Sequence, residues 1–360
     1  MAAGSIFKWN QWIAPVLIGV AAAAALIWFG IQYPVTDPET GATSTSWELI
    51  RRFSWSTRST YALLGVLACV VIRDLGYIVR LRVLSFGAFT WRQSTENIVL
   101  WELASALTPS VVGGSAVAVV LLKRDGLRWG KSLATVFATA MMDEAFYLLA
   151  VPLAFLWAQS GGHAIFPDVP VGYESAAWGA QSVFWLAYAF IATLTATLLF
   201  GLVLRPQATF RFLQWAKSTR PLTRWSERIG AWANDLLEAS RTIRNAPAGY
   251  WVKGFAATCS SWTARFMTLN MILLVFYPQV EHAAVLARQL LLWLVLSISP
   301  TPGSSGAAEL GLPAFLSDLT GLAYIAAVVL LWRTFTYFIY LVAGAFVLPG
   351  WLVRTQRKEP

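Results

Sequence analysis

The chain has 360 residues, of which 57% are hydrophobic and only 12% are charged, with 19 tryptophans and a formal net charge of +9. Soluble domains carry about a quarter charged residues, so this composition excludes an ordinary soluble domain and predicts an all-α polytopic membrane protein. The basic residues cluster in particular loops, which indicates membrane topology and no binding of nucleic acid.

Six apolar runs reach the length of about 20 residues that a helix needs to cross a bilayer. They occupy residues 12–31, 59–79, 132–157, 178–203, 251–276 and 321–347. Two further apolar stretches, 96–122 and 286–316, are interrupted by Gly and Pro. Because the interruptions fall in corresponding places of two halves, we expect about six transmembrane helices plus two opposed re-entrant helical hairpins, related as an inverted repeat.

The basic residues in the connecting segments indicate the orientation of the chain, because Lys and Arg accumulate on the cytoplasmic side. The connections 32–50, 159–175 and 278–285 contain neither residue, whereas 73–92, 123–131, 205–253 and the C-terminal tail are basic. We therefore expect a multi-pass membrane protein with both termini in the cytoplasm. In this orientation the first interrupted stretch enters from the cytoplasm and the second enters from outside.

The whole chain, residues 1–360, is predicted to form a single transmembrane domain. Its parts are an N-terminal span with an outside loop (1–58), a first half (59–204), a basic cytoplasmic loop (205–250), a second half (251–349) and a cytoplasmic tail (350–360). The basic loop interleaves aromatic and basic side chains, for example Phe212, Trp215 and Arg211. It either lies in the interface of the inner leaflet or is an ordinary charged connector.

The two interruptions resemble each other, as TPSVVGGSAV (108–117) and SPTPGSSGAAEL (299–310). In each, a Thr-Pro pair is followed by glycines and then by a helix start, which we place at Ser115 and at Ala307. Helix starts bind anions through free amides and the positive dipole end, so two that converge near the midplane would hold a phosphate. The residues concerned are Thr108, Pro109, Gly113, Gly114 and Ser115 in the first interruption and Thr301, Pro302, Gly303, Ser304 and Gly306 in the second. The alternative is that Gly and Pro only kink packed helices.

Several charged residues lie within apolar segments, where charge is costly and has to face a cavity or a partner. Asp143, Glu144, Arg265 and Arg333 lie near the middle of predicted spans. We expect one of the two carboxylates to pair with one of the two arginines. The alternative is that the arginines bind a phosphate head group, which suits guanidinium geometry.

The interrupted stretches contain three more candidates, Glu102, Arg288 and Glu309. Their carboxylates would contact an ammonium group or a proton, or only cap a helix end. Arg73 and Asp74 lie near the inner end of their predicted span, where snorkelling accounts for them.

Signs of catalysis are few in this sequence. The two histidines, His163 and His282, lie in outside connections without a Cys or carboxylate cluster at metal-binding spacing. We find no phosphate-binding loop, dinucleotide motif or nucleophile elbow. The sequence therefore predicts no catalytic residue, no metal and no cofactor.

Three segments resemble a known family. They are WELASALTPSVVGGSAVAVVLLKRDGL (101–127), MMDEAFYLL (141–149) and ARQLLLWLVLSISPTPGSSGAAELGL (287–312). Together they are similar to the flippase-like family that includes the membrane domain of bacterial lysyl-phosphatidylglycerol synthetases, here in a stand-alone form without the aminoacyltransferase domain. The resemblance implies a lipid translocator of the inner membrane with two opposed re-entrant hairpins, and it does not imply lysyl transfer.

The sequence thus predicts a protein that moves a lipid with an anionic head group, a phospholipid or a polyprenyl phosphate, between leaflets. No ATP site is visible, so movement would be downhill or coupled to protons or ions, with one half rocking against the other. Two alternatives stay open: an accessory protein that only binds a polyprenyl phosphate or other lipid in envelope assembly, and a membrane enzyme that modifies a lipid. A homodimer stays open as well.

Overall fold

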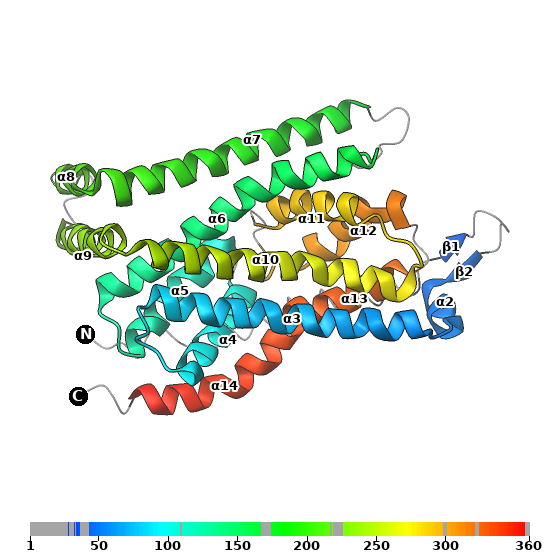
Figure 1. The fold of residues 1–360 in the computed structure, drawn as a ribbon, viewed down its shortest axis with the longest axis horizontal. Coiled ribbons are helices and arrows are strands. Elements are labelled where there is room, and N and C mark those ends of the chain that lie inside the picture. Colours follow the sequence, from blue (N-terminus) through cyan, green and yellow to red (C-terminus); the bar gives the residue numbers. More distant parts are fainter. Residues whose placement is uncertain are drawn as a thin grey trace.

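Long helices lie side by side along most of the molecule (Figure 1). The computed structural model describes residues 28, 32, 34–36, 43–108, 110–166, 174–216, 218, 226–297, 301–320 and 324–356. In this part, the segments long and apolar enough to cross a membrane are Thr57–Leu84, Trp129–Ser160, Phe184–Leu204, Ala248–Phe276 and Ile325–Gln356. They match five of the six predicted spans, and the sixth, 12–31, lies outside the described residues except for residue 28. The structure confirms an all-α multi-pass membrane protein.

The elements of the first half begin with a small antiparallel hairpin, in which β1 (Pro34–Thr36) pairs with β2 (Thr43–Thr45). The helices that follow are α2 (Ser46–Arg52), α3 (Thr57–Leu84), α4 (Trp91–Leu107), α5 (Ser110–Arg124), α6 (Trp129–Ser160) and α7 (Glu174–Leu198). A π-helical turn, Leu199–Leu204, extends α7.

The rest of the chain contains a helix pair at one end of the bundle and then the remaining long helices. Its elements are α8 (Pro206–Ala216), α9 (Ser226–Arg244), α10 (Ala248–Phe276), α11 (His282–Ser297), α12 (Ala307–Thr320), α13 (Ile325–Arg333) and α14 (Ile339–Gln356). A second π-helical turn, Thr334–Phe338, joins α13 to α14.

Polar side chains set the start of several helices. The Ser56 hydroxyl accepts a hydrogen bond from the Ser59 amide at the start of α3, at 3.1 Å. Thr90 and Gln93 form a reciprocal capping box at the start of α4. These contacts supply partners for amides that the first turn of a helix leaves unpaired.

The most extensive helix contact of the described chain joins α3 to α10. Gly76 lies at this contact, where an added Cβ would be 2.2 Å from the Ser261 hydroxyl oxygen. The two backbones therefore approach closely, as is typical of helix interfaces in membranes, where small residues allow close packing.

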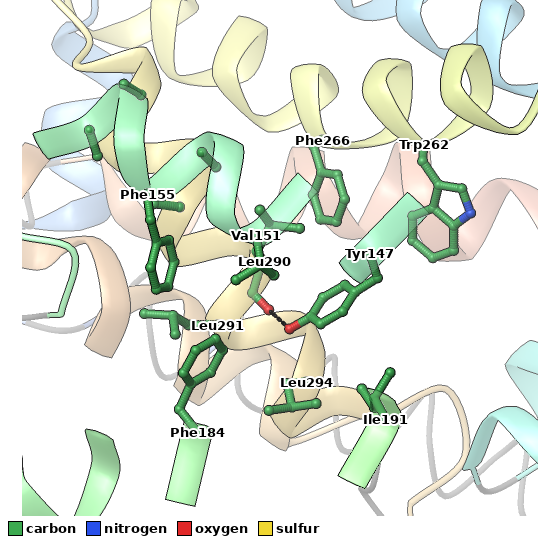
Figure 2. Close-up of a cluster of buried hydrophobic side chains, with 14 residues drawn as sticks. Tyr147, Val151, Phe155, Phe184, Ile191, Trp262, Phe266, Leu290, Leu291 and Leu294 are labelled. Atoms are coloured by element: carbon green, nitrogen blue, oxygen red, sulfur yellow. Dashed lines mark hydrogen bonds between the residues drawn. The ribbon is translucent and has the colours of Figure 1, made fainter. Parts of the chain in front are cut away.

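A cluster of buried aromatic and aliphatic side chains connects α6, α7, α10 and α11 (Figure 2). Phe155 and Phe184 pack on Leu291, and the Tyr147 hydroxyl donates a hydrogen bond to the Leu290 carbonyl oxygen at 2.8 Å. This buried bond fixes α6 against α11. It thereby positions the acidic residues that lie one turn before Tyr147 in α6.

The segment predicted as a basic cytoplasmic loop contains the two helices α8 and α9, which pack on each other. Figure 1 shows both helices end-on, across the ends of α7 and α10. Phe212 and Trp215 on α8 and Trp232 on α9 are 60%, 64% and 59% exposed. Exposed aromatics beside basic residues on helices that cross a bundle end favour the interfacial alternative over the plain connector.

The last long helix belongs to both halves of the molecule. Its first part, α13, contacts α10 and α12, whereas its last part, α14, contacts α4. Gly344 of α14 packs directly on Leu103, and Trp351 and Arg354 both bond to the Asp125 carboxylate after α5. The π-helical turn lies between these two sets of contacts.

Two predictions about α3 were wrong. The helix continues through Leu84, so Arg80 lies within the helix and is buried, and it does not belong to an inside loop. Arg73 does not snorkel: its side chain is 0% exposed, pairs with Asp74 at 3.1 Å and donates to the Phe335 carbonyl oxygen. Acidic and carbonyl partners make these positions tolerable, and a count of apolar residues does not detect such partners.

Candidate functional site

The first interruption is a short break between two packed helices. Helix α4 ends at Leu107, and α5 already begins at Ser110, with Pro109 outside the described residues. The predicted helix start at Ser115 was therefore wrong. The glycines lie inside α5, where a Cβ at Gly114 would be 2.1 Å from the Ser105 hydroxyl oxygen. They serve the close packing of α5 on α4.

The second interruption is a wider turn, with backbone that favours glycine. Gly303 and Gly306 have φ angles of +55° and +88°, and Ser304 between them has +54°. The Ser304 hydroxyl donates to the Leu296 carbonyl oxygen at 2.6 Å and holds the turn on α11. Helix α12 starts at Ala307, as predicted.

A buried ion pair fixes this second turn. Glu309 accepts a hydrogen bond from the Gly306 amide at 2.7 Å and pairs with Arg333 at 2.8 Å. Arg333 also donates to the Gly303 carbonyl oxygen at 3.3 Å and the Ser305 hydroxyl at 3.1 Å. The carboxylate of the chain itself thus occupies the start of α12, where the sequence predicted an external anion.

The two interrupted pairs lie toward opposite ends of the bundle (Figure 1). Helices α4 and α5 are toward the end that contains α8, α9 and the end of α14, and α11 and α12 are toward the other end. The Tyr337 hydroxyl donates to the Ala106 carbonyl oxygen at 3.4 Å, while the ring of Tyr337 lies against Gly303. This tyrosine therefore links the two interruptions. Their entry from opposite membrane faces stays a prediction.

A cavity of about 280 Å³ lies between the two interruptions. Its walls come from α3, α4, α5, α6, α10, α11 and the last helix. The predicted residues that line it are Glu102, Thr108, Ser115, Asp143, Glu144, Arg265, Gly303, Ser304 and Arg333. The described predicted residues that do not line it are Gly113, Gly114, Arg288, Thr301, Pro302, Gly306 and Glu309. The structure thus brings about half of the predicted set together.

The predicted ion pairs inside the cavity were wrong. Asp143 pairs with Arg80, and it also accepts a hydrogen bond from the Trp262 indole at 2.6 Å. Arg333 pairs with Glu309 and not with an acidic residue of α6. Arg80 had been assigned to a loop, so its charge was not available as a partner when the sequence alone was considered.

Arg265 differs from the other two arginines of the cavity. Its guanidinium lies 3.4 Å from the Tyr77 hydroxyl and 5.3 Å from the centre of the Trp262 ring. Among the described residues no carboxylate forms an ion pair with it, whereas Arg80 and Arg333 each have one. Arg265 is therefore a cation of the cavity whose charge no side chain of the described chain neutralises through a direct contact.

Two carboxylates of the cavity are also without an ion pair to a described residue. Glu102 contributes to the α4 wall, and Glu144 contributes to the α6 wall. The Glu144 Oε2 atom is buried and has no hydrogen-bond partner, and the same holds for the amide nitrogen of Gln289 on α11. An unpaired buried polar atom is costly, so such atoms on a cavity wall point to a ligand or a proton.

Arg288 lies away from the cavity. It pairs with Asp318 and donates to the Phe315 carbonyl oxygen at 3.1 Å and the Ala164 carbonyl oxygen at 3.2 Å. These contacts join α11 to α12 and to the segment that follows α6. Among the described residues, no group of three His, Cys, Asp or Glu side chains is arranged to hold a metal ion.

Sequence reasoning missed several polar residues of the cavity, above all Tyr77 and Arg80 on α3. Asp74, Tyr77 and Arg80 follow one another at a spacing of three, which places them on one face of a helix. A polar face in a span of this length is a signal that would have found them.

These features define a class: a multi-pass helical membrane protein with a polar, charged cavity between two interrupted helix pairs. Residues 16–344 match the family described as the lysylphosphatidylglycerol synthase TM region, and the chain belongs to this family. It is similar to the UPF0104 membrane protein of Archaeoglobus fulgidus, with 24% identity over 352 residues that cover 94% of this chain and 98% of that protein. No solved structure matches the chain. The family match confirms the resemblance seen in the sequence.

Proposed function

We propose that this protein moves a lipid with an anionic, phosphate-bearing head group between the two leaflets of its membrane. The observation that carries the proposal is Arg265, a guanidinium on a cavity wall without an ion pair to a described residue. Guanidinium matches the geometry of a phosphate, and the neighbouring Tyr77 hydroxyl adds a donor. A lipid tail stays in the apolar surroundings while its head group enters the cavity.

The position of the cavity supports movement in addition to binding. It lies between the two interruptions, which belong to the two predicted halves of the chain, 59–204 and 251–349. In transporters built from such halves, the site near the midplane stays in place while the halves rock around it. We therefore propose that the head group crosses by way of this cavity. The phosphate contact proposed here is Arg265, in place of the helix starts considered from sequence.

Reconstitution of the purified full chain tests this function. Vesicles of phosphatidylcholine carry a trace of phosphatidylglycerol with a fluorescent acyl chain, and dithionite bleaches only the label that is in the outer leaflet. We expect the protein to speed the exchange of label between leaflets. In Arg265→Gln the exchange falls about tenfold or more, as expected for the loss of a charge-assisted hydrogen bond worth about 1.5–3 kcal/mol.

Arg92→Gln is the matched control, because Arg92 on α4 is 83% exposed and lies away from the cavity. It keeps the exchange rate of the unmodified chain. Equal rates in Arg265→Gln and Arg92→Gln contradict the assigned phosphate contact. Vesicles in which the unmodified chain binds the labelled lipid but does not speed exchange support the accessory lipid-binding alternative instead.

A further inference from the structure

We propose that Glu144 carries a proton together with the anionic head group, so that the protein is a lipid–proton symporter. This inference rests on the proposed function. It follows from the charged side chains of the cavity that no ion pair neutralises. It also assigns a role to an acidic group that has a buried oxygen without a hydrogen-bond partner and that the phosphate contact leaves unused.

The cavity has an excess of negative charge. The arginines of its wall are Arg80, Arg265 and Arg333, and the carboxylates are Glu102, Asp143 and Glu144. Asp143 neutralises Arg80, and Glu309 behind the wall neutralises Arg333. One positive charge, on Arg265, remains against the two carboxylates of Glu102 and Glu144.

A phosphate that binds Arg265 adds a further negative charge to this balance. The cavity would then contain three anionic groups against one unpaired guanidinium, within a bundle of largely apolar helices. Like charges at close range in low dielectric are strongly unfavourable. Uptake of one proton by a carboxylate of the wall removes this penalty, so a bound anionic head group favours a protonated site.

Glu144 is the carboxylate best placed to take up that proton. Its Oε2 atom is buried without a hydrogen-bond partner, whereas no oxygen of Glu102 is both buried and unpaired. The neighbouring Asp143 is neutralised by Arg80 and also accepts the Trp262 indole. An unpartnered carboxylate in this position is costly, and a carboxylic acid costs less and offers an O–H donor.

The remaining titratable groups of the wall do not compete for this role. Tyrosines from α3 and the last helix line the cavity, namely Tyr77, Tyr337 and Tyr340. Tyr147, one turn after Glu144, donates to the Leu290 carbonyl oxygen instead. The described wall residues of α5 and α11 carry no charge. Tyrosine hydroxyls ordinarily keep their proton at neutral pH, so the acidic residues alone can exchange one there.

One proton balances the single negative charge of a phosphodiester head group. The pair crosses without net charge, so a pH difference drives transport and a membrane potential does not. With one proton per lipid, a difference of one pH unit supports a leaflet ratio of up to about tenfold. This property separates the inference from simple downhill exchange.

The test uses the same vesicles with acyl-labelled phosphatidylglycerol, now with an imposed pH difference or, separately, a potassium diffusion potential. We expect label to accumulate in the leaflet away from the acidic side and the potential to have no effect. Glu144→Gln, which imitates the protonated state, exchanges label between leaflets but no longer accumulates it. Glu144→Asp restores accumulation, which shows that loss in the Gln variant is not a folding defect. Glu227→Gln, an exposed position on α9, is the matched control and behaves as the unmodified chain.

Each other result overturns a stated part of the inference. Exchange without accumulation in the unmodified chain removes proton coupling and leaves the proposed function intact. Accumulation that persists in Glu144→Gln assigns the proton to another group. Transport that is independent of pH but requires an ammonium-bearing phosphatidylethanolamine shows that the lipid supplies the compensating charge. Absence of any exchange removes the proposed function itself.

Discussion

The two interrupted helix pairs share a sequence pattern and differ in almost everything else. In the first, α5 starts two residues after Thr108, and its glycines pack on Ser105 of α4 and on Thr108, which follows α4. In the second, a turn with three left-handed residues is held by the buried pair of Glu309 and Arg333. One pair is stabilised by close packing and the other by charge. Similar motifs in the two predicted halves therefore do not specify equivalent chemistry.

The largest expected effect concerns the second interruption, which a buried ion pair stabilises. Glu309→Gln removes one member of a pair whose side chains are 2% and 6% exposed, so Arg333 stays buried and unpaired. We expect the free energy of unfolding to fall by about 3–5 kcal/mol. The thermal midpoint in detergent measures it, with exposed Glu227→Gln as control. Equal midpoints in these two variants would show that charge does not hold this turn.

A second, smaller effect is expected where packing dominates. Gly114→Ala places a Cβ 2.1 Å from the Ser105 hydroxyl oxygen and 2.9 Å from its Cα atom. We expect a loss of about 1–3 kcal/mol from overpacking. Combining it with Ser105→Gly, which removes the obstructing side chain, recovers part of the loss. If the double variant is no more stable than Gly114→Ala, the contact between α4 and α5 is not the cause.

The smallest effect isolates backbone conformation in the second turn. A Cβ at Gly306 meets no atom within 4 Å, but φ is +88°. Gly306→Ala therefore loses only about 1 kcal/mol, through left-handed strain. Gly350→Ala, which also meets no atom and has no left-handed φ, is the matched control and keeps or slightly raises stability. A loss at Gly306 as large as that at Gly114 would mean that the turn is packed more tightly than its contacts indicate.

The spans and the two interruptions followed from sequence because membrane crossing imposes a length and a composition that can be counted. Five spans occur where apolar runs predicted them. The start of α12 was also predictable, since Glu309 follows Gly306 at the three-residue spacing of a capping box. The same spacing also indicated that the Glu309 carboxylate, and not an external anion, would accept a hydrogen bond from the amides at the start of α12. Of the alternatives for Glu309, capping of a helix end was therefore the correct one.

The partners of the charged residues did not follow from sequence. Pairing depends on the depth and rotation of two helices that lie far apart in the chain, as for Arg80 and Asp143. Hydropathy locates a residue along the membrane normal only approximately, and it does not determine how a helix is rotated about its own axis. Arg265 and Arg333 had looked equivalent, yet only Arg333 meets a carboxylate of the described chain directly. The structure was therefore needed to distinguish Arg333, which forms a structural ion pair, from Arg265, which a ligand can bind.

The π-helical turn Thr334–Phe338 has a mechanical consequence for the last helix. Because α13 is attached to the second half and α14 to the first, relative rotation of the halves would twist this one helix. A π-helical turn interrupts the i→i+4 hydrogen-bond pattern of the α-helix around it, and such turns are frequent at functional sites. In the proposed rocking of the halves, this segment would act as a torsion joint between α13 and α14. Arg333, just before it, and Tyr337, within it, both line the cavity.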